Sequence, residues 1–195
     1  MRNTKEYLLT KAYEQYLLHG YASVSISVLQ QELQIGRASL YYYFKDKDSL
    51  FATILENFFL IPLEHALNAP STITVSELIE NRVQCIQQIA HYISNLKNPK
   101  IQLSNIGALI LSGYIHIPAF KARLLELGKL QFEQWETAIR NSIALGEIKP
   151  TCDITQAAFL FQNLKCGYED PYSLNRGDNA ELYRMSCNYL LNLFK

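Results

Sequence analysis

The 195-residue sequence has no excess of charge of either sign, because its 18 Lys and Arg residues balance its 18 Asp and Glu residues. This balance excludes a protein that holds nucleic acid through bulk positive charge, so any DNA affinity must depend on where individual cations lie. Disorder is also excluded, because a hydrophobic fraction of 49% is enough for a globular chain with a real core.

The four cysteines form no Cys-x-x-Cys pair, and a disulfide framework is not expected in a chain of this length. No apolar leader opens the sequence, and the densest apolar run, residues 58–63, is far shorter than the roughly 20 residues of a membrane span. Metal-ligand spacing, phosphate loops and hydrolase motifs are also missing. We therefore expect a cytoplasmic protein that is not an enzyme, with no metal, no cofactor and no membrane partner.

Glycine and proline are few, 8 and 6, and most stand where a helix would begin or end. Apolar residues recur at helical spacing without strand alternation or repeats, which predicts an all-α fold of about nine helices. Gly113 and Gly146 are expected to stop helices, and Pro62 to end or kink one. The predicted helices span about residues 4–18, 26–33, 37–43, 47–60, 75–96, 100–112, 118–145, 153–165 and 179–193.

Two short predicted helices, 26–33 and 37–43, are joined by a tight turn and follow a longer helix, which is helix-turn-helix geometry. In that geometry the second short helix lies in the major groove and the first crosses the DNA backbone. Ser25 and Asp46 are expected to cap the helices that begin at residues 26 and 47. The inward positions that would form the small core are Ile26, Leu29, Leu33, Ile35, Leu40 and Phe44.

The outward side chains of the second short helix carry groups that read DNA. Arg37 can donate two hydrogen bonds to O6 and N7 of a guanine. The hydroxyls of Ser39, Tyr42 and Tyr43 can donate to phosphates or bases. Lys47 combines a cation with a helix N-terminus, which favours a phosphate. Residues 1–52 nevertheless hold six basic and five acidic residues, a net charge of only +1.

The first predicted helix carries a core stripe at Leu8, Ala12 and Tyr16. A Gly20-Tyr21 turn follows, and residues 40–50 read Leu-Tyr-Tyr-Tyr-Phe-Lys-Asp-Lys-Asp-Ser-Leu. This pattern resembles the DNA-binding domain of the TetR family of bacterial transcriptional repressors. A weaker resemblance to the junction before that family's penultimate helix lies at residues 146–158. The family more often has Gly at the position of Gln34 and Ser at the position of Gly36.

The resemblance implies a DNA-binding transcriptional regulator, most simply a repressor that a small, mostly apolar ligand releases from its operator. It also implies a DNA-binding domain over residues 1–52 and a ligand-binding and dimerisation domain over residues 53–195. The predicted DNA contacts are Ser25, Ser27, Arg37, Ala38, Ser39, Tyr41, Tyr42, Tyr43 and Lys47. The alternative, which the neutral charge, Gln34 and Gly36 favour, is a helical small-molecule-binding protein or enzyme without sequence-specific DNA binding.

Apolar stripes on the last two predicted helices are suited to a partner surface, unless both are buried in the single chain. These stripes are Ile154, Ala157, Ala158, Phe161 and Leu164 on one helix, and Leu182, Met185, Tyr189 and Leu193 on the other. The resemblance implies that the two helices pair with those of a second subunit, which gives a homodimer on a palindromic DNA operator.

A pocket between the middle helices, with apolar walls and a few polar tips, would suit a hydrophobic or aromatic effector. The same aromatic residues at helical spacing could instead be ordinary core. The candidate lining residues are Phe58, His65, Ile89, Tyr92, Ile110, Tyr114, Trp135 and Phe159.

Overall fold

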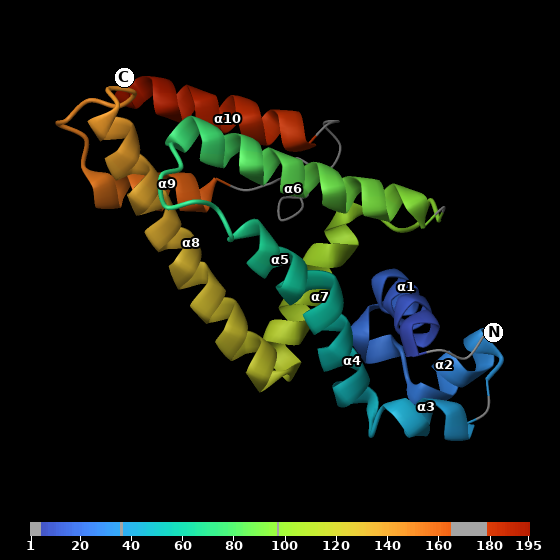
Figure 1. The fold of residues 1–195 in the computed structure, drawn as a ribbon. Coiled ribbons are helices and arrows are strands. Elements are labelled where there is room, and N and C mark those ends of the chain that lie inside the picture. The colour runs from blue at the N-terminus through green and yellow to red at the C-terminus, as the bar shows by residue number, and fades with distance from the viewer. Residues whose placement is uncertain (1–4, 36, 97, 165–178) are drawn as a thin grey trace. The chain divides into compact units, whose positions relative to one another are not determined.

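A computed structural model describes residues 5–35, 37–96, 98–164 and 179–195. Every regular element within these ranges is a helix, which confirms the predicted all-α fold class (Figure 1). Among the described helices, none is both long and apolar enough to cross a bilayer. The elements are α1 (Lys5–Ser23), α2 (Ile26–Leu33), α3 (Arg37–Tyr43), α4 (Lys47–Leu55), the π-helical turn η1 (Glu56–Leu60), α5 (Ile61–Ala66), α6 (Val75–Asn95), α7 (Leu103–His116), α8 (Pro118–Ala144), α9 (Ile154–Asn163) and α10 (Asn179–Phe194).

The chain divides into two compact units. Unit 1 comprises Met1–Pro62 and Ile93–Leu124, and unit 2 comprises Leu63–Tyr92 and Leu125–Lys195. Unit 1 therefore contains α7 in addition to the helices of the predicted DNA-binding domain. The predicted boundary after residue 52 divides the chain by function, and it stays a prediction.

The first helices of unit 1 follow the predicted helix-turn-helix pattern. The stripe on α1 is fully buried at Leu8, Ala12 and Tyr16. Gly20 interrupts α1 with a φ of 74°, a conformation that glycine adopts readily, at the position where the sequence predicts the helix end. α2 and α3 have the predicted bounds, and the inward residue Leu40 is buried.

Gln34 closes α2 in the left-handed conformation, with φ 52° and ψ 42°. Its backbone N–H donates to the carbonyl oxygens of Gln30 and Gln31, so it completes the last turn of the helix. Among the residues that the structure describes, it alone has a positive φ without being glycine. A side chain strains this conformation by roughly 1–2 kcal/mol, so glycine fits the position better.

The substitution Gln34→Gly is expected to raise the free energy of unfolding by about 0.5–1 kcal/mol. Relief of backbone strain stabilises the folded state, and the greater freedom of glycine in the unfolded chain offsets part of the gain. Urea denaturation followed by circular dichroism measures the change. Gln31→Gly, at an exposed position inside α2, is the control and is expected to cost about 1 kcal/mol. Loss of stability in Gln34→Gly would contradict the strain argument.

Together α4, η1 and α5 form one continuous helical segment, residues 47–66, and Asp46 caps its start as predicted. Pro62 does not end the segment. A π-helical turn precedes it instead, in which the N–H of Ile61 donates to the carbonyl oxygen of Glu56. Proline lacks an N–H and its ring crowds the carbonyl four residues earlier, so a wider turn accommodates Pro62 while the helix continues.

Gly113 lies inside α7, so the prediction of a helix end at this glycine is wrong. The residue is buried, and a Cβ atom on it would lie 2.5 Å from Leu55 Cδ1 and 2.8 Å from the Phe120 ring. The absence of a side chain allows this close approach of α7. The helix continues to His116, and Pro118 opens α8 as predicted.

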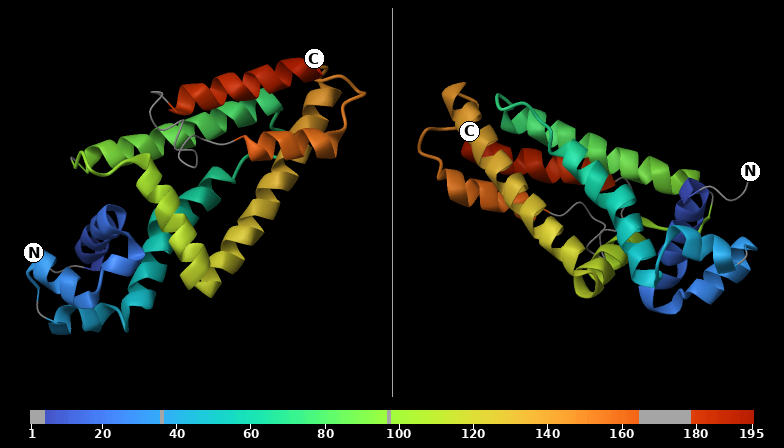
Figure 2. Two further views of the ribbon diagram at one scale, coloured as in Figure 1. Left: turned by 180° about the vertical axis from the view of Figure 1, so that it is seen from behind. Right: turned by 60° about the horizontal axis from the view of Figure 1, so that its bottom comes forward.

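Unit 2 is built around a hydrophobic core that contains Trp135 and Phe161. Their rings stack with centroids 4.8 Å apart and an interplanar angle of 13°. α10 lies beside α6 in both views of Figure 2. The two helices are joined by an ion pair, with a hydrogen bond from Arg184 Nε to Glu80 Oε1 at 2.8 Å. This ion pair and the core hold the last helix against unit 2.

The expected limits of α6 and α8 are confirmed. At the start of α6, the N–H of Thr74 donates to Glu77 Oε2 at 2.8 Å and the N–H of Glu77 donates to Thr74 Oγ1 at 3.3 Å. This is the predicted capping box. Gly146 follows α8 with a φ of 76°, as a C-terminal stop requires.

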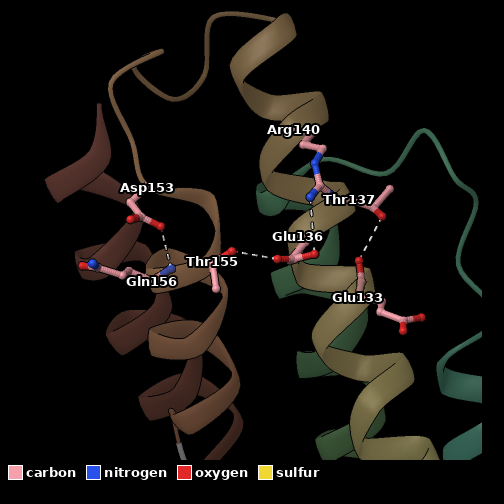
Figure 3. Close-up of polar contacts among 7 residues, drawn as sticks. All are labelled: Glu133, Glu136, Thr137, Arg140, Asp153, Thr155 and Gln156. Atoms are coloured by element: carbon pink, nitrogen blue, oxygen red, sulfur yellow. Dashed lines mark hydrogen bonds and ion pairs between the residues drawn. The ribbon is translucent and has the colours of Figure 1, made fainter.

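Polar contacts attach the start of α9 to α8 (Figure 3). Asp153 caps α9 as predicted, because its carboxylate accepts the N–H of Gln156 at 3.0 Å. The Thr155 hydroxyl donates to Glu136 Oε1 at 3.0 Å, and Arg140 Nη2 lies 3.4 Å from Glu136 Oε2. The orientation of α9 within unit 2 is thereby restrained at its first turn.

The apolar stripe predicted on α9 is not an open surface. Ala157, Ala158 and Phe161 are buried in the core of unit 2, with Ile154 and Leu164 packed against it. Burial within the single chain therefore accounts for this stripe, because the interior of unit 2 needs an apolar face from α9. The exposed large apolar side chains of α9 are Phe159 and Leu160.

Candidate nucleic-acid interface

The first predicted DNA contacts lie at the start of α2. Ser25 Oγ accepts the backbone N–H of Val28 at 3.2 Å, which is the predicted N-cap, and lies 2.8 Å from Ser27 Oγ. Ser27 is exposed. The remaining N–H groups of the first turn and the Ser27 hydroxyl can donate to a phosphate, because a helix N-terminus favours an anion.

α3 presents a buried side and a solvent side. Leu40 and Phe44 are buried as predicted, whereas Tyr41 and Tyr42 are exposed. Tyr42 is 81% exposed, and the half-buried ring of Tyr43 meets it edge-on with centroids 4.8 Å apart. The solvent side of α3 can therefore offer tyrosine hydroxyls and ring faces to DNA.

Three more predicted contacts lie on the same helix. Ala38 is exposed and is small enough to let α3 approach the floor of a groove. The backbones of Arg37 and Ser39 belong to α3, but their side chains lie outside the described part of the chain. Their contacts with bases and phosphates stay predictions.

The start of α4 is fixed by a reciprocal cap. The N–H of Ser49 donates to Asp46 Oδ1 at 2.8 Å, and Ser49 Oγ accepts the N–H of Asp46 at 3.0 Å. The hydrogen bond from the Ser49 N–H lowers the pKa of the Asp46 carboxyl. The carboxylate is therefore ionised at neutral pH, and the cap holds the first turn of α4 in place for Lys47.

Lys47 does not extend freely from this turn. Its Nζ lies 4.1 Å from the ring centroid of Tyr21 and 3.5 Å from the carbonyl oxygen of Ala22. Partial burial lowers the pKa of the Lys47 ammonium. Tyr21 donates its hydroxyl hydrogen to Asp48, and burial, followed by this bond, raises the pKa of Tyr21 to about 12. The Lys47 ammonium thus has a defined position at the surface of unit 1.

Tyr21 is a residue of this site that the sequence prediction missed. The only signal in the sequence is that Tyr21 is an aromatic residue directly after Gly20. This pattern predicts a turn, but it does not predict a contact between Tyr21 and Lys47. The predicted DNA contacts and Tyr21 all belong to unit 1. The structure thus brings the start of α2, the solvent side of α3 and the start of α4 into one compact unit.

The predicted ligand-lining residues are divided between the two units. Phe58, Ile110 and Tyr114 belong to unit 1, whereas His65, Ile89, Tyr92, Trp135 and Phe159 belong to unit 2. Each unit on its own therefore gathers only part of the predicted set.

Several of these residues have neighbours within their own unit. Phe58 stacks on Tyr13 with centroids 4.3 Å apart, and the Lys121 ammonium lies 4.7 Å from the centroid of Tyr114. Trp135 is 2% exposed and serves as core. Phe159, at the other extreme, is 61% exposed on α9. Core packing accounts for Trp135 without a ligand, and the lining role of the set stays a prediction.

An open groove of about 440 Å³ lies on α9 and α10 in unit 2. It contains none of the predicted ligand-lining residues. Its lining is Leu160, Leu164, Met185, Ser186, Tyr189, Leu190 and Leu193. Four members of the two predicted dimer stripes, Leu164, Met185, Tyr189 and Leu193, therefore border this groove. In the described ranges, no three His, Cys, Asp or Glu residues are placed to hold a metal ion.

Residues 8–54 match the sequence model of bacterial regulatory proteins of the tetR family. A curated relative from Lactococcus lactis subsp. lactis, an uncharacterized HTH-type transcriptional regulator in the lacX 3′ region, is 34% identical over 68 residues. This match covers 35% of the present chain and 35% of the relative. The chain thus spans about a third of the length of the curated relative that it matches.

Solved structures extend the likeness of fold to nearly the whole chain. A TetR transcription regulator from Haloarcula marismortui has a TM-score of 0.67 at 18% identity, covering 97% of this chain and 96% of its own. The SmeT–triclosan complex has a TM-score of 0.65 at 16% identity, covering 95% of this chain and 88% of its own. The match to the tetR family model thus covers the helix-turn-helix of α2 and α3 together with parts of α1 and α4, and the likeness of fold to TetR-type regulators extends over nearly the whole chain.

Proposed function

We propose that this protein is a DNA-binding transcriptional regulator that represses from a palindromic operator as a homodimer until a small, mostly apolar ligand releases it. The observation that carries the proposal is the helix-turn-helix of unit 1, with Leu40 and Phe44 buried and Tyr42 exposed on α3. Lys47 stands beside it at the capped start of α4. α3 enters the major groove in this arrangement, and the starts of α2 and α4 contact phosphates.

Few cations are available for the phosphates. Lys45 and Lys47 alternate with Asp46 and Asp48, and residues 1–52 carry a net charge of +1. Each subunit therefore displaces few counterions, which gives a shallow dependence of affinity on salt. Tight binding then requires that two subunits act together on the two halves of the operator.

The proposed dimer surface is the groove on α9 and α10. Met185, Tyr189 and Leu193 of the predicted α10 stripe are 60–70% exposed, and Leu160 of α9 borders them. A second copy of the same face would remove these side chains from water, because a two-fold axis matches a surface with itself. Two DNA-binding units joined in this way suit half-sites about one helical turn apart.

The proposed effector is a small, mostly apolar molecule. The apolar character of the predicted lining residues and the binding of triclosan by the similar protein SmeT support this choice. A ligand that binds the dimer better in a conformation unable to span both half-sites shifts the population away from DNA. The segment 53–67 is proposed to link the ligand to DNA binding, because it begins in the last turn of α4 and continues through η1 and α5.

Arg37→Ala is expected to weaken operator binding about tenfold or more and to relax base preference, because it removes a two-bond contact to guanine. Lys47→Ala is expected to weaken binding to all sequences similarly and to reduce the salt slope by about one. Fluorescence anisotropy with a palindromic duplex enriched from random-sequence DNA, at several salt concentrations, measures both. Lys129→Ala, which removes an exposed cation from α8, is the control and is expected to leave binding unchanged.

Three outcomes would contradict parts of this proposal. Unchanged binding in both Arg37→Ala and Lys47→Ala would show that the interface is assigned wrongly. A salt slope of order ten would contradict the small number of phosphate contacts. Wild-type protein without sequence preference at low salt would support the alternative, a helical small-molecule-binding protein or enzyme.

A further inference from the structure

The ring of Tyr21 is the centre of an aromatic cluster in unit 1. Its centroid lies 4.6 Å from that of Phe51 and 6.3 Å from that of Tyr16, both of which are buried. The Tyr21 hydroxyl donates to Asp48, in the first turn of α4. These contacts give the ring one orientation, because two ring neighbours and a hydrogen bond restrain it at once.

The fixed ring in turn restrains Lys47. The Lys47 ammonium lies 4.1 Å from the ring centroid, within the range of a cation–π interaction, and 3.5 Å from the carbonyl oxygen of Ala22. A lysine side chain otherwise samples many rotamers, so these two contacts reduce the entropy that Lys47 loses when it meets a phosphate.

The same ring contacts a helix far along the chain. His116, the last residue of α7, stacks on Tyr21 with centroids 4.7 Å apart and an interplanar angle of 26°. His116 is itself exposed. Both residues belong to unit 1, in which α7 packs on α1 and α4. The Tyr21 ring thus contacts both the end of α7, through His116, and the ammonium of Lys47.

We propose that Tyr21 is a positioning residue for the phosphate contact of Lys47, and that His116 controls Tyr21, so that a displacement of the end of α7 weakens DNA binding through this ring. The proposal rests on the proposed function of unit 1 and names a route of regulation for the same interface. A shift of α7 that separates His116 from Tyr21 leaves the ring free to turn. Lys47 then loses its restraint without any change in α3.

Tyr21→Leu is expected to lower operator affinity about fivefold and His116→Ala about threefold, the range of one ring contact each. Tyr21→Phe keeps the ring and is expected to stay within about twofold of wild type. In the Lys47→Ala background, Tyr21→Leu and His116→Ala are expected to have no further effect, because the group they position is absent. Anisotropy with the enriched palindromic duplex gives all of these values.

A second measurement needs no DNA. The Lys47 ammonium lies over the Tyr21 ring, so the NMR resonances of the adjacent ε-methylene protons are expected to be shifted upfield in the full-length protein. The shift should be lost in Tyr21→Leu, reduced in His116→Ala and kept in His19→Ala. His19→Ala removes an exposed histidine of α1 and serves as the matched control in both experiments.

The two readouts separate this proposal from the proposed function. Equal losses from His116→Ala with and without Lys47 would overturn the proposal, since His116 would then act elsewhere. If the NMR shift of Lys47 is the same in wild type, Tyr21→Leu and His116→Ala, the proposal is overturned as well. Wild-type protein that binds no duplex overturns the DNA-binding function, whereas the Lys47 shift still tests the arrangement of His116, Tyr21 and Lys47.

Discussion

Replacing Met185 and Tyr189 together by glutamate is expected to convert the proposed dimer into monomers and to lower operator affinity about 100-fold or more. The two side chains are 60% and 70% exposed and border the groove on α10. In a two-fold dimer each glutamate would be placed in an apolar interface near its own copy, which costs both desolvation and repulsion. Fold disruption is not expected, because neither side chain is buried in the single chain.

The large expected loss of operator affinity follows from the weak binding of DNA by a single subunit. With a net charge of +1 over residues 1–52, one DNA-binding unit holds few phosphates. Joining two units makes the second contact intramolecular and multiplies affinity without new contacts to DNA. Sedimentation equilibrium and anisotropy on the same samples measure the two losses together.

The matched control is the double substitution Leu125→Glu and Leu145→Glu. Both leucines are exposed, both belong to unit 2, and the variant has the same change in charge. It is expected to stay dimeric and to bind DNA like wild type. If Met185→Glu with Tyr189→Glu also stays dimeric, the subunits associate through another surface.

Gly113→Val is expected to lower the free energy of unfolding by about 3 kcal/mol, the upper end of the usual cost of overpacking. The first added carbon already lies 2.5 Å from Leu55 Cδ1 and 2.8 Å from the Phe120 ring, and the two methyl groups of valine need more space. Either α7 moves away from α4 or the two side chains leave their preferred rotamers. Urea denaturation followed by circular dichroism gives the value.

Alanine at two glycines provides the comparison. Gly113→Ala is expected to destabilise, because the clash outweighs the better helix propensity of alanine. Gly128→Ala, inside α8, is expected to stabilise by about 0.5–1 kcal/mol, since an added Cβ there has no atom within 4 Å. The same sign of change at both positions would contradict the close packing of α7.

The helix starts were predictable because their signals are local. Ser25, Asp46 and Asp153 each cap the helix that follows, and each accepts an N–H three residues ahead. The buried stripe of α1 was also predictable, because a 3.6-residue period repeats its apolar residues. Within the candidate site, the capped start of α4 and the exposed side of α3 follow from the same short-range rules.

The remaining features depend on contacts between distant segments. Glycine is a typical residue at a helix end, yet Gly113 lies inside α7 and allows the helix to approach Leu55 closely. No residue near Gly113 in the sequence indicates this contact. The α9 stripe is apolar whether it faces the core or a partner, so its burial could not be assigned from spacing. The contacts of Tyr21 with Lys47 and His116 join three helices and leave no pattern in the sequence.

The π-helical turn Glu56–Leu60 introduces a phase shift into residues 47–66. An α-helix advances about 100° per residue, so one additional residue in a turn rotates everything after it by about that angle. In an uninterrupted α-helix, the residues seven positions after the buried Ile54 and Leu55, at positions 61 and 62, would also face inward. The structure instead buries Leu60 and exposes positions 61 and 62. In an uninterrupted α-helix of the same sequence, Pro62 would therefore face the buried side. Removing one residue of the π-turn would let an ordinary α-helix form and would leave Pro62 on the exposed side that it has now.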